Sequence, residues 1–304
     1  MSKINVYIGC CKTDFYLLRS CVASIRYWNK EVPVLLLKDF SNGVFDTTEL
    51  EKMFNVSVAK TKYKKLGGYM KLQPYIEQTE ESIFLQDADM VWLGDVAQLL
   101  INIEGDIAVH AYKPADIDKE LNQWYFNTEK LKKYYPNYRY PGFVFNCGTI
   151  FMTTKTFGQP DFEDIIVWRE GAKPKFDGVF LCEDQGIINF IVAQKYCANT
   201  ISITNIDFQI SAESDMARSY SLEEIEKGNP ENIIVHWVGK KSGLNSFCSS
   251  HHLLRFFETQ YYSHCKNGNA KILVERIYRT IKHLDRFIFE IGKFFYYSFI
   301  PGKK

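Results

Sequence analysis

The sequence lacks several features that would place it in a familiar class of proteins. It has no Cys-x-x-Cys pair and no Gly-x-Gly-x-x-Gly motif, which argues against a paired-cysteine zinc site and a dinucleotide-binding fingerprint. No apolar run approaches the roughly 18 residues that a membrane-spanning helix needs. The first residues are polar and do not resemble a secretory signal. Because the eight cysteines are scattered, we expect reduced thiols and a cytoplasmic protein.

Net charge is nearly absent as well. The 37 Lys and Arg residues almost balance the 36 Asp and Glu residues, so we expect no nucleic-acid partner. The balance is local, however, because residues 271–304 carry eight basic and three acidic side chains. We find no internal repeat and no low-complexity linker. A chain of 304 residues with 46% hydrophobic content therefore predicts one large domain, over residues 1–265, followed by a basic appendage over residues 266–304.

The N-terminal residues predict a βαβ unit. Apolar and turn patterns favour a strand over residues 4–9, a helix over 15–28 and a strand over 32–37. Such a unit implies a parallel sheet with a right-handed crossover. Ligands of these sheets bind at the carboxyl ends of the strands. Residues 9–16 and 38–39 should therefore lie close together, near two aspartates at the end of a later strand.

The rest of the chain continues the α/β alternation. We expect helices over residues 47–54, 161–170 and 183–194, and a further helix that begins near residue 67. We expect strands over 56–60, 82–93, 106–110, 143–154, 201–208 and 233–238. The segment 114–141 breaks this rhythm because it is crowded with aromatic and basic residues. It is either a packed connection or a lid and acceptor platform, since aromatic faces suit sugar rings.

The chain is organised around Asp87-Ala88-Asp89 at the end of an apolar run. On a continuous strand the two carboxylates would share a face and repel each other. A divalent cation such as Mg²⁺ or Mn²⁺ would relieve that repulsion. The alternative is that the pair caps the following turn or helix.

Further polar groups stand at strand ends and helix starts, and their order supports a resemblance. Tyr69-Met70-Lys71-Leu72, Phe84-Leu85-Gln86-Asp87-Ala88-Asp89, Phe145-Asn146-Cys147-Gly148, Asp184-Gln185-Gly186-Ile187-Ile188-Asn189 and His236-Trp237-Val238-Gly239 follow one another along the chain. This series resembles the retaining glycosyltransferases of family 8, the group of glycogenin and the lipooligosaccharide galactosyltransferases. The resemblance covers about residues 4–243 and implies the GT-A fold, with a mixed, mostly parallel sheet flanked by helices.

The resemblance also implies a reaction and a set of roles. The reaction is transfer of a hexose from a UDP-sugar to a glycan or glycolipid acceptor, with retention of configuration, in surface polysaccharide or lipopolysaccharide synthesis. Mn²⁺ or Mg²⁺ would bind Asp87, Asp89 and His236, and the catalytic candidates are Lys71, Asp184 and Gln185. The donor-binding candidates are Gly9, Cys10, Asp14, Tyr16, Lys71, Asp87, Ala88, Asn146, Asp184, Gln185, Gly239, Lys240 and Lys241.

One position departs from the family pattern. Ser242 stands where the family has a phosphate-binding lysine, and no Pro-Trp follows it. Lys240 or Lys241 would then have to supply the charge. Two rival interpretations stay open: a sugar nucleotidyltransferase, although no Gly-rich N-terminal loop with a basic residue is present, and a non-catalytic relative that binds carbohydrate or a partner protein.

The basic appendage predicts an amphipathic helix. Its apolar residues recur at spacings of three and four, namely Val274, Ile277, Ile281, Leu284, Ile288, Ile291 and Phe295. This seam would pack on the catalytic domain, pack on a second copy in a homodimer, or contact an anionic membrane surface through residues 271–304. In the last case the protein would be peripheral on the inner face of the membrane.

Overall fold

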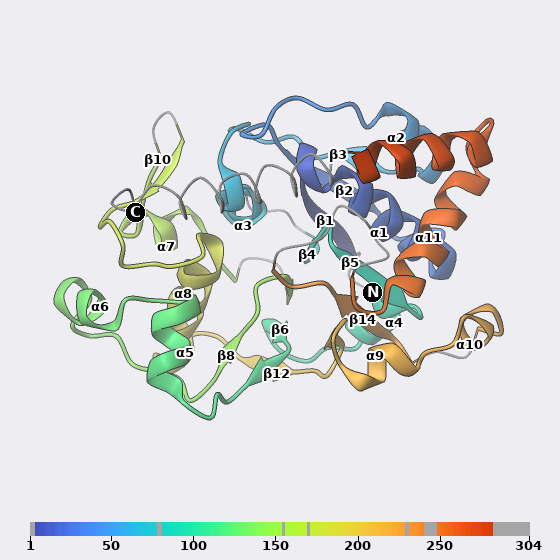
Figure 1. Cartoon of the computed structure of the whole chain (residues 1–304). Helices are drawn as coiled ribbons and strands as arrows, with labels where there is room; N and C mark the ends of the chain where they lie inside the picture. Colours follow the sequence, from blue (N-terminus) through green and yellow to red (C-terminus); the bar gives the residue numbers. More distant parts are fainter. Residues whose placement is uncertain are drawn as a thin grey trace, which may run out of the picture.

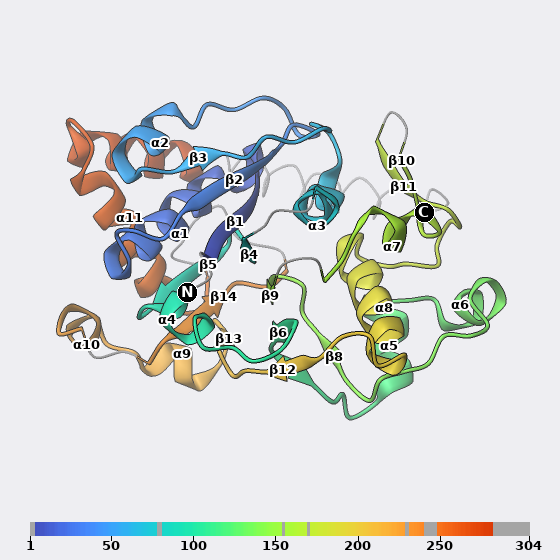
Figure 2. The same ribbon diagram turned by 180° about the vertical axis from the view of Figure 1, so that it is seen from behind.

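The computed structural model of the chain describes residues 4–77, 81–153, 156–168, 171–228, 231–239 and 248–281. Its centre is a seven-stranded sheet with the order β12-β6-β9-β4-β1-β2-β3 (Figures 1 and 2). The strands are β1 (Ile4–Cys11), β2 (Val34–Asp39), β3 (Ser57–Val58), β4 (Ser82–Asp87), β6 (Ile107–Val109), β9 (Thr149–Met152) and β12 (Ile203–Asn205). Only β9 runs antiparallel to both of its neighbours. The expected mixed, mostly parallel α/β sheet is therefore confirmed.

The predicted βαβ unit is present at the centre of this sheet. The 3₁₀ helix η1 (Lys12–Asp14) and helix α1 (Phe15–Trp28) connect β1 to β2, and β1 pairs in parallel with both β2 and β4. Successive residues of β1 alternate between the two faces of the sheet. Val6 and Ile8 pack with α1 and α2 (Thr48–Phe54), whereas Tyr7 packs in a second core. Gly9, Asp39 and Asp87 thus reach the same edge.

The second core holds the other helical layer. It contains η2 (Gly67–Leu72), α3 (Gln73–Ile76), α7 (Gln159–Glu163) and α8 (Asp184–Cys197). The segment 114–141 forms α5 (Ile117–Trp124) and α6 (Thr128–Tyr134), and most of its aromatic residues join this core. Tyr125 and Phe126 are buried, and the Tyr134 ring stacks on Phe176. The described contacts fit the packed connection, while Trp124 is exposed.

A smaller sheet carries the remaining strands of the site. It has the order β13-β14-β5, with β13 (Gln209–Ser211), β14 (Ile233–His236) and β5 (Met90–Leu93). Helix α11 (His251–Ser263) covers it, and residues 268–281 form a further helix. The other elements are α4 (Val96–Leu100), β7 (Ala111–Tyr112), β8 (Val144–Phe145), β10 (Ile166–Trp168), β11 (Ala172–Pro174), α9 (Asp215–Ser219) and α10 (Leu222–Glu226).

Three local predictions were wrong. The helix expected over residues 161–170 ends at Glu163, and the β-branched and aromatic residues of β10 pair with β11 instead. The strand expected over 143–154 is interrupted by a turn at residues 146–148. Asp87 and Asp89 do not share one strand, because β4 ends at Asp87 and residues 88–89 form the turn into β5.

Part of the C-terminal prediction lies outside the described residues. The helix over 268–281 agrees with the expected amphipathic helix, but residues 282–304 are not among those described. In the described ranges, each helix is too short or too polar to span a bilayer.

Candidate active site

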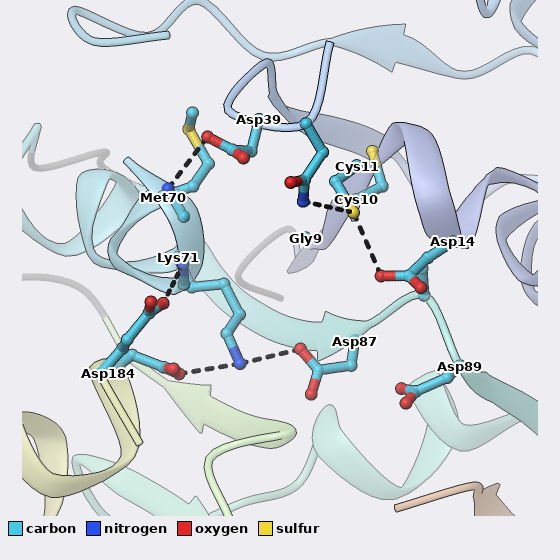
Figure 3. A pocket seen from close by; sticks show the side chains of 15 residues that line it. Gly9, Cys10, Cys11, Asp14, Asp39, Met70, Lys71, Asp87, Asp89 and Asp184 are labelled. Carbon is cyan, nitrogen blue, oxygen red and sulfur yellow. Dashed lines mark hydrogen bonds and ion pairs between the residues drawn. The ribbon is translucent and has the colours of Figure 1, made fainter. Parts of the chain in front are cut away.

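A cavity of ≈ 370 Å³ opens at the carboxyl ends of β1, β2 and β4, where the βαβ topology predicts a ligand. Figure 3 shows its side chains converging from these strands, η2 and the start of α8. The lining residues are Gly9, Cys10, Cys11, Asp14, Asp39, Asn42, Gly67, Gly68, Met70, Lys71, Asp87, Ala88, Asp89, Glu183 and Asp184. The volume lies in the range of small-molecule sites, about 300–1,000 Å³.

Lys71 is the centre of the polar network. Its Nζ lies 2.8 Å from Asp87 Oδ1 and 2.8 Å from Asp184 Oδ2, so that one ammonium bridges two carboxylates (Figure 3). Lys71 reaches this position from η2 by passing over Gly9. A Cβ atom on residue 9 would lie 2.9 Å from Lys71 Cγ, so glycine is needed there for the close approach. The structure thus links the strand β1 glycine directly to the placement of Lys71.

The ion pairs leave Asp184 only partly stabilised as a carboxylate. Burial raises the pKa of Asp184 to about 6, with a further contribution from the nearby Asp87 and an opposing one from Lys71. The pKa of Lys71 is raised because the two carboxylates outweigh its burial. Lys71 is therefore a fixed positive charge, whereas Asp184 can gain or lose a proton near neutral pH.

Asp87, Asp89 and His236 form a candidate metal site. One ligand atom from each lies within 4.8 Å of the others, and His236 Nε2 is 3.5 Å from Asp89 Oδ1. Burial lowers the pKa of His236 to about 4, against the attraction of Asp87. The ring is therefore neutral at pH 7 and has one nitrogen lone pair. Two carboxylates and a neutral imidazole form a donor set that suits a divalent metal ion.

The loop between β8 and β9 shapes the wall behind His236. A Cβ atom on Gly148 would lie 2.7 Å from His236 Cε1 and 2.6 Å from Asn146 Oδ1. Asn146 Oδ1 accepts a hydrogen bond from the Gly148 backbone N–H at 2.7 Å. The Phe-Asn-x-Gly pattern thus gives a tight turn in which glycine leaves room for the imidazole.

His236 has a second polar neighbour on its other nitrogen. Gln209 Nε2 lies 3.2 Å from His236 Nδ1, and Gln209 Oε1 lies 2.5 Å from the hydroxyl of Thr149. Thr149 is fully buried and Gln209 is half-buried. This chain connects the candidate metal site to strands β13 and β9.

Two further carboxylates fix the loop that carries Lys71. Asp39 Oδ1 accepts hydrogen bonds from the backbone N–H groups of Leu66 and Gly67. Glu183, with φ at +49°, accepts one from the Gly68 N–H. A side chain on residue 68 would collide with Glu183. These contacts hold η2 against β2 and the start of α8, and so set the position of Lys71.

The cavity lining is strongly acidic. Six carboxylates and one lysine are among the described residues that line it. The lysine already forms ion pairs with two of these carboxylates. Such a site repels a free diphosphate. Binding of an anionic ligand therefore requires added positive charge, which the Asp87, Asp89 and His236 set can hold.

The structure brings some of the predicted donor-binding residues together. Gly9, Cys10, Asp14, Lys71, Asp87, Ala88 and Asp184 line the cavity. Tyr16, Asn146, Gln185 and Gly239 are not among the lining residues. The Tyr16 ring lies 5.0 Å from the Arg279 guanidinium, and Gln185 Nε2 donates to the Trp124 carbonyl. Lys240, Lys241 and Ser242 lie outside the described residues, so their phosphate-binding role stays a prediction.

Sequence reasoning missed Gln209 and the direct roles of Asp39 and Glu183. Asp39 had a signal, because it ends a strand at the ligand edge. No sequence signal pointed to Gln209, since only the pairing of β13 with β14 brings it to His236, 27 residues away.

Comparison with known proteins supports the fold. No family model matches the sequence, and no curated protein matches it. Among solved structures, the bifunctional glycosyltransferase WbbM shares 15% identity over 86% of this chain and 50% of its own, with a TM-score of 0.54. The glycosyltransferase GlyE of Streptococcus pneumoniae TIGR4 shares 12% identity over 92% and 64%, with a TM-score of 0.51. An active-site mutant of LgtC shares 13% identity over 84% and 94%, with a TM-score of 0.50.

These likenesses show that the chain has the GT-A glycosyltransferase fold. At such identities they show the fold alone. The chain spans half the length of WbbM and under two thirds of that of GlyE.

Proposed function

We propose that this chain is a metal-dependent glycosyltransferase of the family 8 type. It would transfer a hexose from a UDP-sugar, with retention, to a glycan or glycolipid acceptor in surface polysaccharide or lipopolysaccharide synthesis. The observation that carries the proposal is one cavity, in which Lys71 bridges Asp87 and Asp184 beside the Asp87, Asp89 and His236 set. A GT-A fold alone would support many functions, so the charges that line this cavity carry the choice of donor.

The acidity of the cavity supports a nucleotide-diphosphate ligand that binds together with a cation. Mn²⁺ or Mg²⁺ bound to Asp87, Asp89 and His236 would attract the negatively charged diphosphate. It would also stabilise the negative charge that develops on the diphosphate as the bond to the sugar breaks. Asp14, Asp39 and the end of β1 line the far side of the cavity, where we assign the nucleoside. Lys71 would contribute a second fixed positive charge close to the same carboxylate.

We assign Asp184 to the part of the cavity that would hold the donor sugar, because it lines the cavity beside Lys71. Asp184 opens α8 at the cavity, held by Lys71, and its carboxylate form dominates above about pH 6. It could orient sugar hydroxyls and stabilise positive charge that develops at the anomeric carbon. Gln185 follows at the same helix start and contacts the carbonyl of Trp124. We assign the exposed Trp124 to the acceptor side, because aromatic faces bind sugar rings.

A panel of UDP-sugars tests the proposal. The purified chain is incubated with each donor and Mn²⁺, and slow UDP release is measured without acceptor. We expect one or a few donors to be hydrolysed, and EDTA to stop the release. Configuration at the anomeric carbon of the released sugar is read by NMR.

Two other outcomes would favour the rival interpretations. If pyrophosphate is formed from UTP and a sugar 1-phosphate while no UDP-sugar is hydrolysed, the chain is a nucleotidyltransferase. If neither reaction occurs and a UDP-sugar still binds with Mn²⁺, the chain is a non-catalytic relative.

A further inference from the structure

His236 can bind a cation through Nε2 only in one of its two neutral forms. The ring carries one N–H, and a metal ligand must present a lone pair. Nε2 faces Asp89 at 3.5 Å, whereas Nδ1 faces Gln209 at 3.2 Å. The proton must therefore sit on Nδ1 when Nε2 holds a cation. The group opposite Nδ1 must then accept a hydrogen bond.

Gln209 can hydrogen-bond to either neutral form of the His236 ring. With its amide nitrogen toward Nδ1 it donates to the ring, which places the ring proton on Nε2 and leaves no lone pair for a cation. If the amide turns over, its oxygen accepts from Nδ1–H and its nitrogen donates to the Thr149 hydroxyl. The hydroxyl adapts, because it both donates and accepts. The Gln209 amide thus has two arrangements, and each matches one tautomer of His236.

The backbone keeps Gln209 in this position. β13 pairs in parallel with β14, with Gln209 opposite Ile234 and Ser211 opposite His236. Gln209 is two residues from the partner of His236 and therefore shares its face of the sheet. The buried Thr149 holds the far end of the amide. The amide can rotate but cannot move away from the ring without breaking both contacts.

We propose that Gln209 is a positioning residue that selects the tautomer of His236, with its amide oxygen toward Nδ1 whenever the site holds a divalent cation. The proposal rests on the metal site of the proposed function. Partners of this kind fix the orientation and tautomer of metal-binding histidines, and their loss commonly weakens metal affinity 10- to 100-fold. Gln209 would act through His236 and would not touch the donor.

Mn²⁺ binding, measured by EPR of the free ion, tests the proposal in the metal-free full chain. Gln209→Leu removes both hydrogen bonds, and we expect Mn²⁺ affinity to fall about 10- to 100-fold. Gln209→Glu presents only acceptor atoms to Nδ1, and we expect affinity equal to or above that of the wild type. Thr149→Val is the matched control, since it removes the outer contact and keeps the inner one. Its affinity should stay within about threefold of the wild type.

The outcomes separate this inference from the proposed function. If Gln209→Leu binds Mn²⁺ as tightly as the wild type, or if Gln209→Glu loses as much affinity as Gln209→Leu, the tautomer role is wrong. UDP release by the wild type in the same preparations would then leave the proposed function standing. If the wild type releases UDP without binding Mn²⁺, the metal site itself is wrong and this inference falls with it. Circular dichroism melting confirms that each variant is folded.

Discussion

Two ion-pair clusters of this molecule have opposite charge patterns. The open cluster consists of Lys71 with Asp87 and Asp184, one cation between two carboxylates at the edge of a cavity. The closed cluster consists of Glu258 with Arg276 and Arg279, one carboxylate between two guanidinium groups. It joins α11 to the helix over residues 268–281. Arg279 also lies over the ring of Tyr16, at the start of α1.

The difference between the clusters is the charge around them. Asp89, Glu183, Asp14 and Asp39 add negative charge to the cavity of the open cluster. Glu258 in the closed cluster is almost fully buried and accepts hydrogen bonds from both arginines. A buried carboxylate that accepts hydrogen bonds from two arginines has a structural role. Unbalanced negative charge around a cavity favours the binding of a cation or another ligand there. The clusters should therefore respond differently to substitution and to metal.

The largest effect is expected from Asp89→Asn, in the cavity of the open cluster. The substitution keeps the shape of the side chain and removes one of the negative ligands of the candidate metal site. Mn²⁺ affinity and UDP release should each fall by at least about 100-fold, since a direct ligand matters more than its supporting partners. The melting temperature without metal should stay close to that of the wild type. Isothermal titration and UDP release measure the two losses, and full activity in this variant would reject the metal assignment.

Lys71→Met should make the folded state depend on metal. Without the ammonium, Asp87 and Asp184 face each other across the cavity, and their repulsion lowers stability by several kcal/mol. Bound Mn²⁺ would restore a positive charge beside Asp87. We therefore expect Mn²⁺ to raise the melting temperature more in this variant than in the wild type, as measured by differential scanning fluorimetry.

Glu258→Gln is the matched control from the closed cluster. It also removes the central charge of a cluster, and it leaves two arginines without a carboxylate at a cost of about 3 kcal/mol. Mn²⁺ should raise its melting temperature by the same increment as in the wild type. An equal increment in all three proteins would contradict the contrast between the two clusters.

Changing pH should act on the open cluster through Asp184. Its folded pKa of about 6 lies above the ordinary value of 3.8, so the folded state binds the proton more tightly than the unfolded state. The resulting stabilisation is present below about pH 4 and is lost as pH rises through 6, about 3 kcal/mol in all. His236 has the opposite effect on the pH dependence of stability. Because the pKa of His236 is lowered in the folded state, its contribution to stability rises with pH between about 4 and 6.5.

Asp184→Asn separates the two contributions. The wild type should change little in stability between pH 4 and 6, whereas this variant keeps only the His236 contribution. Its stability should rise by about 1.4 kcal/mol per pH unit over that interval. Urea unfolding of the metal-free proteins at pH 4.5 and 6 measures the difference. A wild type and a variant that change in parallel would show that Asp184 does not titrate there.

The sequence predicts the members of the open cluster better than their contacts. Strand ends and motif order place Asp87 and Asp184 at one edge, together with His236 of the candidate metal site, because the right-handed βαβ rule fixes which ends of the strands meet. The bridge through Lys71 depends on the path of a 3₁₀ helix over Gly9, which no periodicity encodes. The contact between Gln209 and His236 depends on strand register. Such contacts are set by tertiary packing rather than by local sequence.

The closed cluster was harder to predict from the sequence. The basic residues of the tail suggested a surface that faces anionic lipid. In the structure Lys271, Arg276 and Arg279 instead pair with Glu49 and Glu258. The described seam residues Val274, Ile277 and Ile281 remain exposed, and so do their apolar neighbours Leu273 and Tyr278. Within residues 268–281 the helix agrees with the sequence spacing, but the spacing did not show which face the protein itself covers.

The smallest effect is expected at this seam. Because the ion pairs of residues 271–279 belong to the fold, a test of membrane binding should leave them in place. We propose that Ile277 and Ile281, followed by residues 282–304, contact an anionic membrane surface. Deletion of residues 282–304 should lower flotation with phosphatidylglycerol liposomes several-fold, and Ile277→Ser with Ile281→Ser should lower it less, since each removes part of the apolar area. Both variants should keep the wild-type rate of UDP release, because neither change touches the open cluster. If both float as the wild type does, or if a concentration-dependent dimer is lost instead, the seam serves a second copy of the chain or the fold itself.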